Sequence, residues 1–245
     1  MNKFLVAIQI FLGVALVSFT LFLLLSLGNL QWSEVWAYRK VFWNGWKNTV
    51  YISVCSLGLS LAIGIFTALL RRSGIPLAVF LSRFFVELIR GTPLLVQILF
   101  FYYVVAHQVG LENRFIAGII ILSIFHAAYI AEMIRTGIEN VSATQLESAH
   151  AIGLTTFQSY RFVIFPQAIR QVTPPLAGQF ASIIKDSSLL SIIGINELTN
   201  SAQQVNSATY STLESFFPLA LGYLILTLPI SLLSKKLENR FHYET

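Results

Sequence analysis

Long apolar runs constrain the fold of this chain more than any other feature. Several of them approach or reach the roughly 20 residues that a helix needs to cross a bilayer. Backbone groups in lipid must be satisfied within the segment, so the runs predict spanning helices. With 56% hydrophobic and 11% charged residues, the chain also has too little polar surface to coat a soluble globule. We therefore expect an all-α integral membrane protein, with apolar runs at 4–27, 50–70, 94–106, 115–134 and 216–233.

The first run, residues 4–27, is predicted to be an uncleaved membrane helix. It is longer than the roughly 7 to 15 apolar residues of a secretory signal, and no small-x-small cleavage site follows it. We therefore count six spans, near 4–27, 47–70, 83–107, 115–136, 168–194 and 215–234.

Lysines and arginines predict the orientation of these spans. With a cytoplasmic N-terminus, the cytoplasmic flanks hold Lys3, Arg71, Arg72, Arg83, Arg135, Arg161, Arg170, Lys235, Lys236 and Arg240. The external loops hold only Arg39, Lys40, Lys47 and Arg114. Both termini are therefore expected in the cytoplasm, with membrane lipid around the spans. Topology alone explains the formal charge of +5, and no nucleic-acid partner is implied.

The third span is predicted to be broken near its middle. The stretch "RFFVELIRGTPLLVQ" places Glu87 and Arg90 three residues apart, hence on one helix face, directly before Gly91, Thr92 and Pro93. Proline removes a backbone donor and clashes with the preceding turn, so the helix should kink or unwind there.

The fifth span carries ionisable groups at about half its depth. Pro174 and Pro175 precede "LAGQFASIIKDSSLLSIIG", which marks this span also as broken. An ionised group at such depth costs about 2.5 to 3.5 kcal/mol on insertion scales, and is tolerated mainly when it faces a cavity or a bundle interior. The residues concerned are Lys185, Asp186, Ser187 and Ser188.

Two broken spans with polar residues at mid-depth are typical of a transporter site. Arg90 suits a carboxylate, and Asp186 or Glu87 suits an ammonium group, which together favour a zwitterion such as an amino acid. The alternative is that the charges of each span pair with one another and only hold the bundle together. The predicted substrate-pathway residues are Glu87, Arg90, Thr92, Gln97, Lys185, Asp186, Ser187 and Ser188.

The segment 137–167 is the longest cytoplasmic one expected. It contains "QLESAHAIGLTTFQSYRFVIFPQ". The part before Gly153 is a good helix former with small residues, Gly153 is a natural stop, and a second helix is expected from about Thr156 to Phe165. Such a compact pair suits docking into a groove on a partner. The alternative, a helix lying on the lipid surface, should carry lysines on its polar face, and this stretch has none.

The spacing from Glu147, Ser148 and Ala149 through Gly153 to Pro166 resembles the cytoplasmic "EAA" loop of ABC importer permeases, usually written EAA, three residues, G, nine residues, I, one residue, LP. Ser148, Val163 and Phe165 depart from that pattern by small or apolar exchanges. The stretches "VELIRGTPLLVQILFFY", "AAYIAEMIRTGIENV" and "IKDSSLLSIIGINEL" resemble the polar amino acid uptake branch (histidine, glutamine, arginine and glutamate). The likeness covers residues 44–240, a five-helix permease domain, and leaves 1–43 as an added N-terminal helix and external loop.

The resemblance implies a permease subunit in a bacterial cytoplasmic (inner) membrane that imports polar amino acids by alternating access. Its implied partners are a cytoplasmic ATPase dimer that receives residues 147–153, an extracytoplasmic amino-acid-binding protein, and a second permease subunit, identical or paralogous. ATP is expected on the partner, since the chain has no GxxxxGK[ST] sequence. No cofactor, catalytic residue or metal site is expected, since the four histidines lack i,i+3 or i,i+4 partners.

Three other functions stay open from the sequence. The first is an intramembrane enzyme in which Lys185 and Ser187 or Ser188 form a dyad. The second is an ion channel or ion-driven carrier that needs no ATPase. The third is an ABC permease for another small solute.

Overall fold

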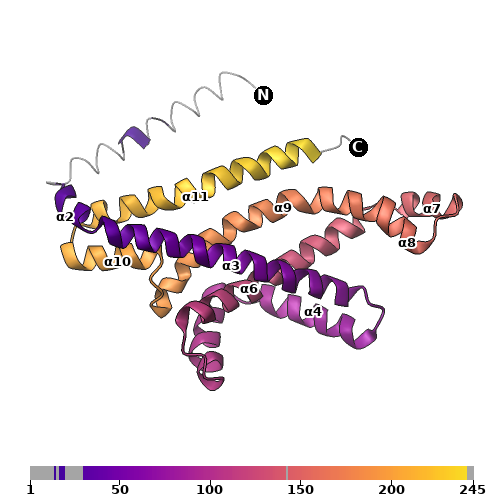
Figure 1. Ribbon diagram of the computed structural model, residues 1–245, viewed down its shortest axis with the longest axis horizontal. Coiled ribbons are helices and arrows are strands. Elements are labelled where there is room, and N and C mark those ends of the chain that lie inside the picture. The colour runs from indigo at the N-terminus through magenta and orange to yellow at the C-terminus, as the bar shows by residue number, and fades with distance from the viewer. Residues whose placement is uncertain (1–13, 15–16, 20–29, 142, 242–245) are drawn as a thin grey trace.

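The computed structural model describes residues 14, 17–19, 30–141 and 143–241. Within these ranges all regular structure is helical (Figure 1). The predicted span 4–27 lies almost wholly outside the described residues. The elements are α2 (Trp32–Ala37), α3 (Arg39–Arg71), α4 (Pro76–Arg90), α5 (Leu94–Phe100), η1 (Phe101–Ala106), α6 (Arg114–Glu139), α7 (Ala143–Ala151), α8 (Thr156–Ser159), η2 (Tyr160–Ile164), α9 (Phe165–Asp186), η3 (Ser187–Ile193), α10 (Leu198–Thr209) and α11 (Thr212–Phe241).

Three of these helices, α3, α6 and α11, are long and apolar enough to cross a membrane. A fourth crossing is counted if α4 and the α5–η1 segment form one bent span. The region predicted as the fifth span is built by α9 and η3, and α9 carries many polar residues. The all-helical membrane fold is confirmed, whereas the count of six spans stays a prediction.

Small residues allow the central helices to approach closely. The face of α3 that packs on α6 carries Ser53, Ser56, Ser60 and Gly64 at helical spacing, all of them buried. A Cβ atom on Gly64 would lie 2.7 Å from the Cγ2 atom of Ile130 on α6. Close backbone approach through small residues is the usual way in which helices associate in membranes.

A cluster of buried apolar side chains lies where α4 and α5 meet α6. It includes Ile89 and Leu94 on either side of the bend, with Leu122 of α6 and Leu190 of η3. Because this core includes residues on both sides of the break between α4 and α5, its packing holds the bend.

Candidate functional site

The chain bends sharply between α4 and α5, where Gly91, Thr92 and Pro93 were predicted to interrupt the helix. The axes of α4 and of the α5–η1 segment differ by 105°. Gln97 holds this bend from the inside, because its amide nitrogen donates to the Ile89 carbonyl and to the Thr92 hydroxyl, both at 2.7 Å. These bonds replace part of the helix ladder that the proline cannot continue. The predicted break is therefore confirmed.

Gln97 also presents an unused acceptor beside the bend. Its side chain is 5% exposed, and among the described residues its Oε1 atom has no hydrogen-bond partner. A buried acceptor without a partner is costly, so a ligand or water at this position would be stabilised by it.

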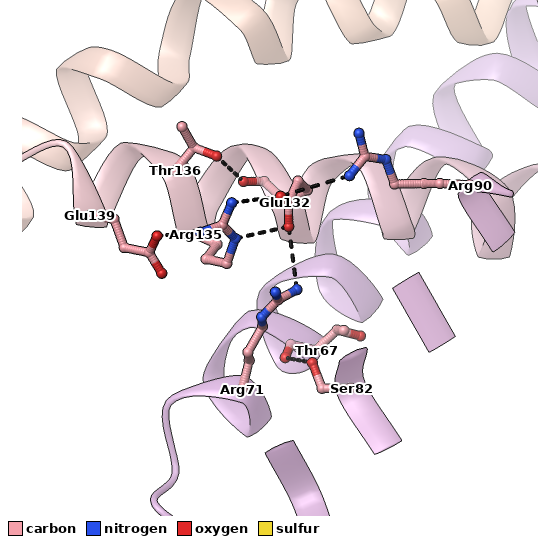
Figure 2. A network of polar contacts seen from close by, with 8 residues as sticks. All are labelled: Thr67, Arg71, Ser82, Arg90, Glu132, Arg135, Thr136 and Glu139. Atoms are coloured by element: carbon pink, nitrogen blue, oxygen red, sulfur yellow. Dashed lines mark hydrogen bonds and ion pairs between the residues drawn. The ribbon is translucent and has the colours of Figure 1, made fainter. Parts of the chain in front are cut away.

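Glu132 on α6 is the centre of an arginine cluster (Figure 2). Arg135 donates to its carboxylate at two points, from Nη2 to Oε1 at 2.6 Å and from Nε to Oε2 at 2.9 Å. Arg71 at the end of α3 donates from Nη1 to Oε2 at 3.3 Å. Arg90 at the end of α4 lies 3.7 Å away, from Nη1 to Oε1. The cluster therefore links three helices through one carboxylate.

Arg90 is the least tightly held member of this cluster. Its side chain is 42% exposed, and its guanidinium lies 5.4 Å from the centre of the Tyr129 ring. Glu87, which the sequence places on the same face, is exposed. Arg90 therefore contacts α6 and not Glu87. The alternative in which the charges of the third span pair with one another does not hold for Arg90.

Asp186 lies where α9 changes to the tighter helix η3. Its Oδ2 atom is 3.4 Å from the Nε2 atom of His126, a residue of α6 that is 1% exposed. The amide nitrogen of Gln179 contacts the other ring nitrogen, Nδ1. An amide NH₂ group can only donate, so Nδ1 accepts and the ring hydrogen lies on Nε2, which makes no hydrogen bond among the described residues. Asp186, too, finds its contact on α6.

The three neighbours of Asp186 differ in their surroundings. Lys185 is exposed and Ser188 is half-buried, whereas Ser187 is fully buried and its hydroxyl donates to the Ile184 carbonyl at 2.8 Å. Of the four predicted pathway residues in this span, Asp186 and Ser188 are therefore the ones at the border between the interior and the surface.

The prediction that Pro174 and Pro175 break the fifth span is wrong. α9 continues through both prolines and changes its helix type only after Asp186. The Pro174 carbonyl accepts a hydrogen bond at 2.9 Å from the Ser234 hydroxyl of α11. A proline leaves the carbonyl four residues before it without its helix donor, so this bond to the Pro174 carbonyl ties α9 to α11 and does not replace a bond that the prolines remove.

One stripe of α6 joins the two predicted halves of the site. His126, Tyr129 and Glu132 follow at intervals of three, so they are neighbours along the helix surface. At 1.5 Å per residue, the first and last are about 9 Å apart along the axis. Asp186 contacts one end of this stripe and Arg90 the other. The structure thus places a negative and a positive group beside one buried helix, at different depths.

Several polar residues that organise the bundle were missed in the sequence. Glu132 and Arg135 have the same three-residue spacing within an apolar span that identified the charges of the third span, so this signal could have found them. His126 and Gln179 give no such signal, because each is a single polar residue in its stretch. The residues missed are His126, Glu132, Gln179 and Glu197.

Glu197 is a fully buried carboxylate at the start of α10. It accepts hydrogen bonds from the backbone N–H groups of Thr199 and Asn200 at 2.8 and 2.7 Å, and from the Tyr223 hydroxyl of α11 at 2.8 Å. Burial raises the pKa of this carboxyl group, and the hydrogen bonds offset part of that effect. Glu197 fixes α10 to α11 at the end of the bundle far from α7 and α8 (Figure 1).

At the other end, residues 143–164 form a helical hairpin, here called the α7–α8 hairpin (Figure 1). α7 ends just before Gly153, whose φ of +86° is a left-handed conformation that suits glycine. Thr155 then caps α8, because its hydroxyl accepts from the Gln158 N–H and its own N–H donates to the Gln158 side chain. The predicted helix, stop and second helix are confirmed.

The α7–α8 hairpin presents a mixed surface. Glu147 and Ser148 are exposed, while Ala149 is buried inside the hairpin. Two large apolar side chains, Ile152 and Phe157, are 76% and 71% exposed. Pro166 lies in the first turn of α9, where the chain leaves the hairpin. Exposed apolar side chains beside polar ones are typical of a surface that docks on a protein.

Apolar spanning helices, a bent span beside opposite charges, and a protruding helical hairpin together define a membrane transport permease. The family model "binding-protein-dependent transport system inner membrane component" matches residues 60–243. The chain belongs to this family.

Relatives extend over most of the chain. It is 35% identical to the glutamine transport system permease protein GlnP of Escherichia coli (strain K12) over 212 residues, which cover 86% of this chain and 97% of the relative. It is 36% identical over 206 residues to the probable glutamine ABC transporter permease protein GlnM of Bacillus subtilis (strain 168), covering 82% and 95%. It is 38% identical over 193 residues to the nopaline transport system permease protein NocM of Agrobacterium fabrum (strain C58 / ATCC 33970), covering 75% and 80%.

Solved structures have the same fold. A chain from the crystal structure of an amino acid ABC transporter with histidines superimposes with a TM-score of 0.81 at 34% identity, covering 87% of this chain and all of that one. A chain of an inward-facing MetNI methionine ABC transporter gives a TM-score of 0.64 at 18% identity, covering 85% of this chain and 98% of that one. This second match supports the fold alone. The ABC importer permease fold predicted from the sequence is confirmed.

Proposed function

We propose that this chain is the membrane-spanning subunit of an ATP-driven importer that moves polar amino acids across the bacterial cytoplasmic membrane by alternating access. The observation that carries this proposal is the stripe of α6 that has Asp186 at one end and Arg90 at the other. Asp186 and Arg90 contact α6 residues that lie about 9 Å apart along its axis, and one amino acid carries both the ammonium and the carboxylate group that suit these two charges. The relatives named above are permeases of glutamine and of nopaline, which carry both groups.

In this proposal Arg90 binds the substrate carboxylate and Asp186 its ammonium group. The unused Oε1 atom of Gln97 and the half-buried Ser188 add hydrogen bonds at the bend and at the start of η3. Arg90 is suited to this role because it is half-exposed and held by only one long ion pair, so it can leave Glu132 at low cost.

The α7–α8 hairpin is proposed to dock in a groove of a cytoplasmic ATPase dimer, with Glu147 and Ser148 at the contact. A second permease subunit, identical or paralogous, completes the pathway, and an extracytoplasmic binding protein delivers the substrate at the opposite end. Both termini then lie in the cytoplasm. ATP binding closes the ATPase dimer and draws the two hairpins together, which tilts the bundle around the site.

Uptake of labelled amino acid into proteoliposomes that contain the whole transporter tests the proposal. Glu147→Arg reverses a charge on the exposed face of α7 and should uncouple ATP hydrolysis from uptake. Glu238→Arg makes the same charge change on an exposed position of α11 and serves as the matched control. Uptake that persists unchanged in Glu147→Arg without ATP would contradict the proposal and favour a channel or an ion-driven carrier.

A further inference from the structure

An apolar groove lies between α2, the beginning of α3, and α11. Its volume is about 940 Å³. The chain has four tryptophans, and all of them line this groove: Trp32, Trp36, Trp43 and Trp46. We call it the tryptophan groove. Residues of the proposed substrate site do not line it, so its role must be sought separately.

The indole rings form an ordered and accessible lining. Trp43 and Trp46 stack with centres 5.3 Å apart and planes 7° from parallel. Trp32 meets Phe217 of α11 edge to face at 5.9 Å. Trp36 and Trp43 remain 70% and 58% exposed. Such a surface leaves a large apolar area open, and indole rings are the groups that membrane proteins concentrate at the level of the lipid headgroups.

The lining contains one cation, Arg39, the first residue of α3. Its Nη1 atom donates to the Trp36 carbonyl at 3.3 Å, and its guanidinium lies 5.9 Å from the Trp36 ring. In the described part of the chain no carboxylate pairs with it. A guanidinium has five N–H donors in a planar fork that matches a phosphate, so most of its donors are available.

We propose that the tryptophan groove binds one phospholipid of the extracytoplasmic leaflet, with its acyl chains against the indole rings and its phosphate on Arg39. In the orientation proposed above, this end of α3 lies at the outer surface of the membrane, which is the depth of the phosphate groups. The bound lipid would bridge α2, α3 and α11 on the side of the bundle away from the α7–α8 hairpin (Figure 1).

Charge complementarity favours a lipid over a helix as the occupant. The apolar segment 4–27 of the same chain is a short distance before Trp32, but it contains no aspartate or glutamate. It would fill the groove without supplying an anion for the exposed Arg39 guanidinium. A phospholipid supplies the apolar chains and the anion together.

The experiment uses the intrinsic fluorescence of the tryptophans. The whole transporter is reconstituted with phosphatidylglycerol that carries bromine in its acyl chains, or with unbrominated lipid, then extracted and washed in detergent so that freely exchanging lipid is removed. Bromine quenches an indole that it contacts, so the quenching left after washing reports lipid retained in the groove. Native mass spectrometry counts the retained lipid.

Arg39→Gln should lower the affinity for the retained lipid about tenfold, because one charge-assisted contact is lost. Lys40→Gln, which removes the neighbouring charge outside the groove, should retain the lipid like the unaltered chain. Leu221→Phe keeps Arg39 but fills the groove from α11, so it should expel the lipid. This second variant provides the test if Arg39→Gln does not fold. The proposal is overturned if no quenching remains in the unaltered protein, or if Arg39→Gln retains equal quenching. Either result would mean that the groove is occupied by a protein segment or only by freely exchanging lipid.

Discussion

The three arginines around Glu132 offer a test of whether Arg90 serves transport or only holds helices together. Arg135 makes a two-point contact with Glu132 at 2.6 and 2.9 Å between side chains that are 24% and 22% exposed. Hydrogen bonds to charged groups contribute about 1.5 to 3 kcal/mol. We therefore expect Arg135→Gln to lower the free energy of unfolding by about 2 to 3 kcal/mol.

Arg90→Gln should cost much less. Its ion pair with Glu132 spans 3.7 Å and its side chain is 42% exposed. Exposed pairs contribute about 0.2 to 1 kcal/mol, and the contact with the Tyr129 ring adds about 0.5 kcal/mol. The expected loss is about 1 kcal/mol, which corresponds to a fall in melting temperature of about 2 to 4 °C for a chain of this size. The fall for Arg135→Gln should be two to three times larger.

Uptake separates the two roles. Arg90→Gln should abolish amino-acid uptake while the subunits still assemble with the ATPase, because the substrate carboxylate loses its partner. Arg71→Gln is the matched control, since it removes a single contact of 3.3 Å with the same carboxylate and has no proposed substrate role. If Arg71→Gln reduces uptake as strongly, or if Arg90→Gln destabilises the protein as much as Arg135→Gln, the proposed role of Arg90 is refuted.

Three more predictions concern the bend between α4 and α5, the α7–α8 hairpin and Glu197 at the start of α10. Gln97→Leu leaves the buried Ile89 carbonyl without its side-chain donor, so it should lower the free energy of unfolding by about 1 to 3 kcal/mol. The measurement is the fall in melting temperature, and an unchanged melting temperature would show that the bend does not depend on Gln97. Gly153→Ala places a side chain at φ +86°, which costs about 1 to 2 kcal/mol. This variant should weaken the coupling of ATP hydrolysis to uptake without loss of assembly. Normal coupling would contradict the proposed role of the turn. The raised pKa of Glu197 means that the folded state holds this proton more tightly than the unfolded state, so the stabilisation that this proton contributes is fully present below pH 4.5 and is lost as the pH rises through the raised pKa. Melting curves of the unaltered chain and Glu197→Gln should converge toward low pH, and parallel curves would show that Glu197 does not titrate in this range.

Local signals in the sequence predicted the elements that depend on nearby residues. The bend after Arg90 follows from Pro93, which cannot donate within the helix, and the hairpin turn follows from Gly153. Pro174 and Pro175 gave the same type of signal, yet α9 continues through both of them. A proline in an apolar stretch therefore does not by itself predict a break in the helix.

The partners of the predicted charges could not be read from the sequence for a related reason. α6 is the most buried of the three long apolar helices: 61% of its most apolar stretch is buried, against 39% for α3 and none for α11. A polar group on such a helix is retained mainly when it is paired. His126 finds its partners on α9, whereas Glu132 pairs with Arg135 on its own helix and also with arginines of α3 and α4. Sequence spacing compares positions within one helix, so it can indicate the pair of Glu132 with Arg135 but not the partners from other helices. The most buried helix is therefore the one whose few polar residues, once placed in three dimensions, locate the site between Arg90 and Asp186.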